Sequence, residues 1–328
     1  AAITGEISRS DTGLHQNCGP GRPRVEARDT VRIGFIGTGL IGTPMVERLL
    51  ACGRAVTVWN RSADKLAPLV AAGAQAAASA QDCARDADLV CLCLTDTAAV
   101  EAVVFGGAGI AGAMRPDQLL IDLSSIAPDA TVRMAARLEA ECGAHWLDAP
   151  VSGGVPAARA GRLIVFAGGD ADDLVHAAPV FSALAQRVTH MGGHGAGQLT
   201  KSCNQQLVAC NLLAIAEMLA FAERTGIDVV QVPAALAGGW ADSLPLQVFG
   251  PRMATGVDRP RLGAVGTFRK DIAQVVRLAG EAGADVPFAR AALAAYDEAM
   301  ARADIGAEGD ASRLIRLRRV LDTSRETP

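Results

Sequence analysis

Lysine is scarce in this chain of 328 residues. Of its 31 basic residues only three are lysine, namely Lys65, Lys201 and Lys270. An arginine guanidinium stays charged throughout the physiological pH range, whereas a lysine amine titrates readily when it is buried. A chain that uses arginine for nearly every positive charge keeps lysine where a compact or titratable amine is needed. Each of the three lysines is therefore a candidate for a functional role.

Other absences exclude whole classes of protein. The net charge is −4, and there is no basic stripe or basic-aromatic patch of the kind that binds nucleic acid. No apolar run reaches eighteen residues without a Gly, an Asn or a charge, so no membrane-spanning helix is predicted. The eight cysteines form no CxxC pair, and no Cys/His cluster has zinc spacing, so no metal is predicted. Small buried thiols in a reducing compartment fit this pattern, and we expect a cytoplasmic protein.

The length and the hydrophobic content of 50% predict two domains. Residues 1–30 are rich in Gly, Pro, Arg and Ser, lack periodicity and contain no apolar segment of a secretory signal. We expect a disordered leader there, with an overextended start as the alternative and a role that the sequence does not define, and a loose tail over residues 322–328.

Residues 31–193 alternate short apolar runs with alanine-rich helical segments. Such alternation is typical of an α/β fold with a doubly wound parallel sheet, so we predict an N-terminal Rossmann domain. The predicted strands are Val31–Ile36, Ala55–Trp59, Leu89–Leu94, Leu119–Leu123, Trp146–Ala149 and Leu163–Ala167.

The pattern changes after Gly197. Residues Gln198 to Thr225 contain no Gly or Pro and are followed by Gly226, which predicts one long helix that joins the Rossmann domain to an all-α domain over residues 194–321. This helix is apolar nearly all round, so we expect it to be buried. Since one subunit does not easily supply that much cover, we expect a homodimer or homotetramer formed through the helical domain.

A glycine-rich turn follows the first predicted strand and opens a predicted helix. The spacing Gly37-x-Gly39-x-x-Gly42 in this context predicts dinucleotide binding. The first glycine permits the tight turn, the second lets the backbone approach a pyrophosphate, and the third lets helix and strand pack closely. The candidate cofactor residues here are Gly37, Thr38, Gly39, Leu40, Ile41 and Gly42.

The end of the second strand distinguishes between the two nicotinamide cofactors. An NAD site usually carries an acidic residue there, whereas this chain has Asn60, Arg61 and Ser62, with Lys65 close behind. A guanidinium pairs with a 2′-phosphate that a carboxylate would repel. The sequence therefore favours NADP(H), and NAD(H) remains the alternative if Arg61 only stacks on the adenine.

Four further motifs follow in a fixed order. They are Asp122-Leu-Ser-Ser-Ile-Ala-Pro128, Asp148-Ala-Pro-Val-Ser-Gly-Gly154, Gly197-x-x-x-Lys201-x-x-Asn204-Gln205, and Lys270-Asp271. With these motifs the chain, from about Val31 to Val320, resembles the β-hydroxyacid dehydrogenases, the family of 3-hydroxyisobutyrate dehydrogenase and tartronate semialdehyde reductase.

Lys201 lies in the first turn of the long helix. The helix dipole and burial both disfavour its charged form, so we expect its pKa to fall toward the range of a general acid. The resemblance implies that Lys201 protonates the substrate carbonyl oxygen as hydride arrives, and removes that proton in the reverse direction.

The resemblance also implies which residues bind the substrate. Ser152, Gly153 and Gly154 would hold its carboxylate, although a plain glycine turn is the alternative. Asn204 and Gln205 lie one helical turn after Lys201 and would bind the substrate or orient the amine. Many members carry Asn at the position of Gln205, and the Asn-Gln pair is similar to that of tartronate semialdehyde reductases.

The remaining candidates lie on the cofactor side. Leu94, Thr95, Ser124 and Ser125 follow predicted strands near the expected nicotinamide position, and Lys270 would reach the cofactor from the second domain. Helix capping by the two serines, and an ion pair of Lys270 with Asp271, are the alternatives.

The sequence thus predicts an NADP(H)-dependent oxidoreductase that interconverts a small β-hydroxyacid and its semialdehyde, with tartronate semialdehyde and glycerate as the first choice. The substrate is a small carboxylate, and related short semialdehydes stay open. An imine reductase is the second hypothesis, although such enzymes generally lack the lysine. A non-catalytic NADP-binding protein is the third.

Overall fold

The structure is a computed structural model that describes residues 6–7 and 31–319. It divides into two compact units, Ala1–Lys201 and Ser202–Pro328. The division falls inside helix α9 (Ala196–Arg224), whereas the sequence placed the domain boundary at residues 193/194. Most of the predicted leader and the whole predicted tail lie outside the described residues.

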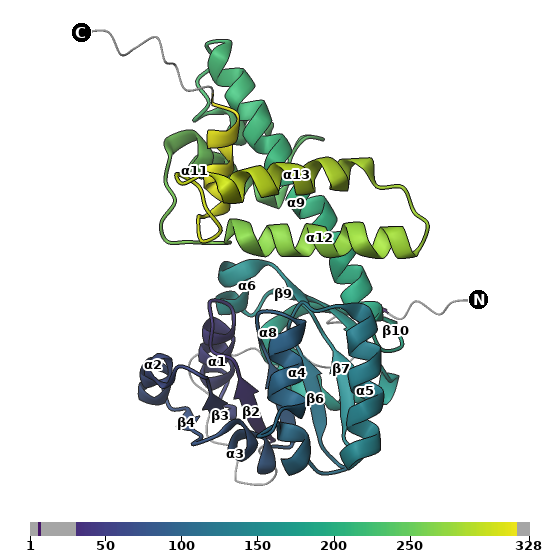
Figure 1. Cartoon of the computed structure of the whole chain (residues 1–328). Helices are drawn as coiled ribbons and strands as arrows, with labels where there is room; N and C mark the ends of the chain where they lie inside the picture. Colours follow the sequence, from purple (N-terminus) through teal and green to yellow (C-terminus); the bar gives the residue numbers. More distant parts are fainter. Residues whose placement is uncertain (1–5, 8–30, 320–328) are drawn as a thin grey trace. The chain divides into compact units, whose positions relative to one another are not determined.

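The described part of the first unit contains a ten-stranded sheet with the order β1-β10-β9-β7-β6-β5-β2-β3-β4, and β8 pairs with β9 (Figure 1). The five strands β3, β2, β5, β6 and β7 are mutually parallel. The strands are β1 Glu6–Ile7, β2 Arg32–Ile36, β3 Ala55–Trp59, β4 Gln75–Ala76, β5 Leu89–Leu92, β6 Leu119–Asp122, β7 His145–Asp148, β8 Val151–Ser152, β9 Leu163–Gly168 and β10 Ala185–Gly192.

Helices cover both faces of this sheet. Successive residues of a strand point to opposite faces, and accordingly Phe35 of β2 packs into one apolar cluster and Ile36 into another. The first cluster contains residues of α1 and α8, and the second contains residues of α4 and α5. The predicted doubly wound Rossmann domain is thereby confirmed. Its helices are α1 Gly42–Ala51, η1 Ala63–Leu66, α2 Ala67–Ala71, α3 Ala80–Arg85, α4 Thr97–Phe105, η2 Ile110–Ala113, α5 Pro128–Cys142, α6 Gly154–Ala160, α7 Ala171–His176 and α8 Ala178–Leu184.

One side of the sheet differs from the prediction. Strand β9 runs antiparallel to β7, because only β8 and the short helix α6 connect them and no full crossover is made. Strand β10 pairs with β9 but was not predicted. Most of its side chains are partly or fully exposed, so it lacks the apolar alternation that marks a strand in sequence.

The second unit is all-α within its described residues, as predicted. The long helix expected over Gln198–Thr225 is α9, and it ends before Gly226, whose φ is 82°. The other helices are α10 Val232–Leu236, α11 Leu244–Thr255, α12 Val265–Glu281, α13 Pro287–Ala301 and η3 Ala311–Leu317.

Helix α9 is packed on one side only. Leu212, Ala216 and Leu219 lie in the core of the second unit, but Leu207 and Phe221 are 73% and 68% exposed. The expectation of burial all round is therefore wrong for the single chain, since its own helices cover only part of the surface of α9. Among the described residues, α9 is also the helix long and apolar enough to cross a membrane. A core helix passes the same test, and the buried side of α9 fits that interpretation.

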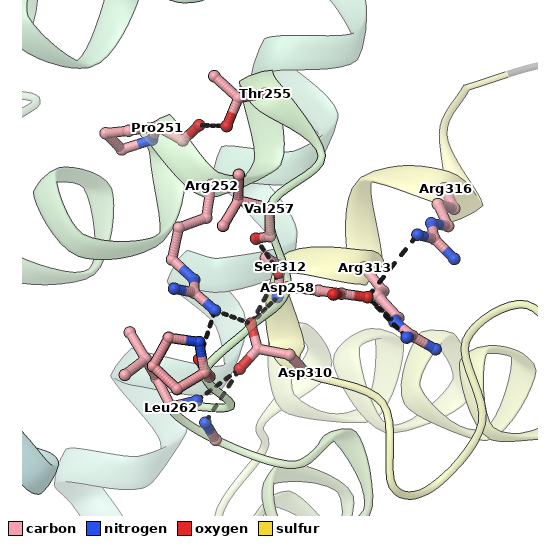
Figure 2. A network of polar contacts seen from close by, with 12 residues as sticks. Pro251, Arg252, Thr255, Val257, Asp258, Leu262, Asp310, Ser312, Arg313 and Arg316 are labelled. Carbon is pink, nitrogen blue, oxygen red and sulfur yellow. Dashed lines mark hydrogen bonds and ion pairs between the residues drawn. The ribbon is translucent and has the colours of Figure 1, made fainter.

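A buried carboxylate holds together three segments of the second unit (Figure 2). Asp310 is 2% exposed, and its Oδ2 accepts hydrogen bonds from the backbone N–H of Leu262 (2.7 Å) and of Gly263 (3.3 Å). Its Oδ1 accepts from the hydroxyl of Ser312 (2.7 Å) and lies 3.5 Å from Arg252 Nη2. The loop before α12, the helix α11 and the start of η3 are thus held by one side chain.

We predict that Asp310→Ala destabilises the protein by about 3 kcal/mol, because it leaves the arginine charge and several buried donors without a partner. Thermal or urea unfolding measures this loss. The matched control is Glu281→Ala, which removes a surface ion pair with Arg277 and should cost less than about 0.5 kcal/mol. Equal effects of the two substitutions would contradict the prediction.

Candidate active site

The predicted cofactor residues of the first unit lie at one edge of the sheet. The carboxyl ends of parallel strands meet at the same edge, and within two residues of the ends of β2, β3, β5 and β6 begin, in this order, the Gly37–Gly42 turn, Asn60–Ser62, Leu94–Thr95 and Ser124–Ser125. The chain reverses its direction of strand addition at β2, which lies between β3 and β5. In open α/β sheets, ligands bind outside the strand ends at such a reversal.

The glycine turn has the geometry of a dinucleotide site. Gly37 has φ 101°, and a Cβ there would collide with the carbonyl oxygen of Cys93. A Cβ at Gly42 would collide with the carbonyl oxygen of Gly37. A Cβ at Gly39, by contrast, would meet nothing within 4 Å, so the backbone there is open to an approaching pyrophosphate. The residues present thus fit a bound dinucleotide.

The loop after β3 is tied to this turn. Asn60 Oδ1 accepts a hydrogen bond from the Thr38 N–H (3.2 Å), and Asn60 Nδ2 donates to the Ser62 carbonyl (3.0 Å). Arg61 and Lys65 are both exposed. The amide of Asn60 therefore holds the loop in shape, while the two cations remain accessible to a ligand.

Ser124 lies deeper than the sequence suggested. It is 2% exposed, its N–H donates to Asp122 Oδ1 (2.9 Å), and its hydroxyl oxygen accepts from the Leu94 N–H (2.9 Å). Its neighbour Ser125 is only half-buried. The Ser124 side chain thus links the loops after β5 and β6, and Ser125 is the more accessible of the two serines.

Two buried carboxylates end neighbouring strands. Asp122 of β6 and Asp148 of β7 are register partners and are fully buried. Burial raises the pKa of Asp122 to about 7 and that of Asp148 to about 6. The Oδ2 of Asp122 has no hydrogen-bond partner among the described residues, which adds to the cost of ionising it.

This pair predicts a pH-dependent stability. The folded Asp122 keeps its proton up to about pH 7, whereas an unfolded aspartate releases it near pH 3.9. The stabilisation that the raised pKa of Asp122 contributes is therefore fully present below the pKa of an unfolded aspartate. It is lost as the pH rises toward the pKa of the folded Asp122, about 7. Between pH 5 and 7 the wild type should lose about 2 kcal/mol of unfolding free energy relative to Asp122→Asn.

Urea unfolding of both proteins at the two pH values measures this difference. The control is Asp117→Asn. Because the Asp117 side chain is 75% exposed, this substitution should leave the pH dependence of the unfolding free energy as in the wild type. If Asp122→Asn followed the wild type in parallel over this range, the raised pKa would be refuted.

The first turn of α9 is fastened to the ends of β6 and β7. Asp148 accepts hydrogen bonds from the N–H of Gly195 (2.8 Å) and of Gln198 (3.0 Å). The Gln198 side chain accepts from the Ile126 N–H (3.1 Å) and donates to the Ser124 carbonyl (2.9 Å). Lys201 follows one turn later and is only 8% exposed.

The candidates of the second unit form their own connected group. Asn204 Nδ2 donates to Gln205 Oε1 (2.9 Å), and Gln205 Nε2 donates to Asp271 Oδ2. The other oxygen of Asp271 lies 3.2 Å from Lys270 Nζ. The ion pair that the sequence left as the alternative for Lys270 is therefore present, and it belongs to a chain of four polar residues.

Sequence reasoning missed three of the residues that organise these groups. Asp122 and Asp148 open recognised motifs but were given no role of their own, and Gln198 was passed over. A signal existed in each case. A carboxylate at the end of a largely apolar strand, and an amide at the start of a largely apolar helix, both become buried and need partners.

Comparison with known proteins matches the chain to two family models, one over its N-terminal part and one over its C-terminal part. Residues 32–193 match the family model of the NAD-binding domain of 6-phosphogluconate dehydrogenase, and residues 195–318 match that described as NAD-binding of NADP-dependent 3-hydroxyisobutyrate dehydrogenase. A 2-hydroxy-3-oxopropionate reductase of Escherichia coli K12 is 40% identical over 225 residues, which are 68% of this chain and 76% of the relative. The chain belongs to the β-hydroxyacid dehydrogenase family.

Other relatives agree with this assignment. A 3-hydroxyisobutyrate dehydrogenase of Pseudomonas aeruginosa is 39% identical over 65% of this chain and 72% of its own length. The crystal structure of a 3-hydroxyisobutyrate dehydrogenase from Salmonella typhimurium superposes with a TM-score of 0.80 at 30% identity, covering 87% of this chain and 99% of that one. This β-hydroxyacid dehydrogenase is thus an oxidoreductase that uses a nicotinamide cofactor to interconvert a small hydroxyacid and its semialdehyde.

Proposed function

We propose that this dehydrogenase interconverts tartronate semialdehyde and glycerate with NADP(H), and that Lys201 is its general acid and base. The observation that carries the proposal is the placement of Lys201. Its side chain is buried in the second turn of α9, directly after the turn that Asp148 and Gln198 fasten to the ends of β6 and β7.

Burial destabilises an ammonium group, which favours transfer of a proton from Lys201 to an oxygen of the substrate. The nicotinamide cofactor, when bound, supplies the hydride that the carbonyl carbon accepts. Lys201 gives its proton to the carbonyl oxygen, and the aldehyde becomes the primary alcohol of glycerate. In the oxidative direction the neutral amine of Lys201 takes that proton back.

We assign the substrate carboxylate to Ser152, Gly153 and Gly154. The three residues span the end of β8 and the start of α6 and are half-buried, and φ of Gly153 is 120°. They offer a hydroxyl and backbone N–H groups without obstructing side chains. Asn204 and Gln205 would bind the substrate hydroxyl, and the Asn-Gln pair is the feature that favours tartronate semialdehyde over other semialdehydes.

NADP(H) is our proposal for the cofactor because the end of β3 carries Arg61 and, just beyond it, Lys65, both exposed, with no carboxylate at the position that holds an NAD ribose. We further assign Leu94, Thr95, Ser125 and Lys270 to cofactor binding. Ser124 would act by holding the Leu94 amide, and NAD(H) would serve as a poorer cofactor.

A panel of short semialdehydes with NADPH tests the substrate. The expected result is the highest kcat/KM with tartronate semialdehyde. A better rate with another semialdehyde would keep the reaction and overturn the substrate. Turnover of imines instead would support the second hypothesis, which the presence of Lys201 and the family assignment both disfavour.

We also propose that the chain forms a homodimer through the uncovered face of α9. Leu207, Ala214 and Phe221 lie at seven-residue spacing on that face and are exposed, and Phe288 of α13, whose carbonyl contacts Cys210 of α9, is 82% exposed. Light scattering is expected to show a dimer or tetramer, and the double substitution Leu207→Glu with Phe221→Glu is expected to dissociate it. A wild-type monomer would refute this proposal.

The seven free cysteines among the described residues fit a reducing compartment, and we propose the cytoplasm.

A further inference from the structure

Gln198 carries a buried amide in the first turn of α9. Its side chain is 1% exposed, and both of its polar atoms are used. Oε1 accepts a hydrogen bond from the Ile126 N–H and Nε2 donates to the Ser124 carbonyl. The amide thereby pairs with the backbone after β6 as a neighbouring strand would.

We infer that Gln198 is a positioning residue that sets where Lys201 stands relative to the Ser124–Ile126 loop. This inference rests on the proposed role of Lys201 as general acid. The two residues are three positions apart on α9 and therefore share one face of the helix. A shift of the first turn moves both together.

The helix does not need the Gln198 side chain in order to begin. Asp148 already accepts hydrogen bonds from the backbone N–H groups of Gly195 and Gln198 and so caps the start of the helix. The amide adds a second connection, to the loop after β6. That loop is joined in turn to Leu94 through the Ser124 hydroxyl. Gln198 thus relates the lysine to two of the loops assigned to the cofactor.

The consequence for catalysis is one of distance. Proton transfer requires the amine within hydrogen-bond reach of the carbonyl oxygen, and a misplacement of about 1 Å lowers rates by up to about 100-fold. Losing the Gln198 side chain leaves the cap of α9 intact, but the position of Lys201 relative to the Ser124–Ile126 loop is then no longer fixed. We therefore expect kcat to fall while cofactor affinity is kept.

The test compares Gln198→Leu and Gln198→Asn with Thr200→Ala. The leucine has a similar volume and no polar atoms, and the asparagine is one methylene too short to reach both partners. Thr200 lies in the same helical turn, and its hydroxyl bonds only within α9, to the Ala196 carbonyl, as far as the described contacts show. Thr200→Ala is thus the matched control for a local loss of helix stability.

Assays are run below the lowest melting temperature of the set, with kcat, its pH profile and the dissociation constant of NADPH measured separately. We expect Gln198→Leu to lose about 10- to 100-fold in kcat, with a smaller loss for Gln198→Asn and less than about threefold for Thr200→Ala. NADPH affinity should stay within threefold, and the pH of half-maximal kcat should move by at least about half a unit.

If either Gln198 variant is as active as Thr200→Ala, with an unchanged pH profile, the inference is overturned. If Gln198→Leu does not fold, Gln198→Asn alone decides the question. Lys201→Met, measured in the same series, separates the two proposals. Activity in Lys201→Met would refute the general-acid role itself. Inactivity of Lys201→Met beside a fully active Gln198→Leu would refute only the positioning role.

Discussion

Replacing Lys201 by methionine is expected to lower kcat by about 1,000-fold, within the range that general acid–base catalysis supplies. Methionine keeps the length and the apolar stem of lysine, and the position is nearly closed to water, so the fold should tolerate it. NADPH binding should be unchanged, since the proposed cofactor loops follow β2, β3, β5 and β6, whereas Lys201 lies on α9. Stopped-flow turnover and fluorescence titration of NADPH measure the two quantities.

Lys201→Arg distinguishes proton transfer from charge. A guanidinium keeps the positive charge but does not release a proton near neutral pH. We expect Lys201→Arg to be as inactive as Lys201→Met, and Glu139→Gln, an exposed change on α5, to behave as wild type. If Lys201→Arg kept more than about a tenth of the wild-type kcat, the lysine would act as an electrostatic group and the proposed proton transfer would be refuted.

The parts of this molecule that were predictable from sequence are those encoded within a few neighbouring residues. The turn from Gly37 to Gly42 and the long uninterrupted helix that became α9 carry local patterns, and both occur where they were expected. The cationic character of the loop after β3 can likewise be read from the sequence, because it depends only on the residue types of Arg61 and Lys65.

The connections between segments were not predictable in the same way. The Gln198 amide meets backbone more than seventy positions away, and Asp271 meets Gln205 at a separation of 66. Nothing near either residue indicates its partner. The sequence also could not show that Leu207 and Phe221 stay uncovered, because exposure depends on how many helices pack around α9. The motifs thus locate the chemistry, and the long-range hydrogen bonds decide its geometry.

Changing Arg61 to serine is expected to lower kcat/KM for NADPH by about 30-fold, since a charge-assisted contact with a phosphate contributes about 2 kcal/mol. The value for NADH should stay within about threefold, because NADH lacks the 2′-phosphate that the guanidinium would meet. Asn60 would keep the loop in place through its bonds to Thr38 and Ser62, so the change should act on the phosphate contact alone. Initial rates with both cofactors give the ratio directly.

Arg133→Ser is the matched control for this change. Arg133 is an exposed arginine of α5 that pairs with Asp129 and lies away from β3 in sequence, so its loss should leave both cofactors unaffected. The Arg61 result also separates the two interpretations of that residue. A loss confined to NADPH supports the phosphate contact. Equal losses with NADPH and NADH would mean that Arg61 stacks on the adenine, which both cofactors share, and the preference for NADP(H) would then have to come from Lys65 or be abandoned.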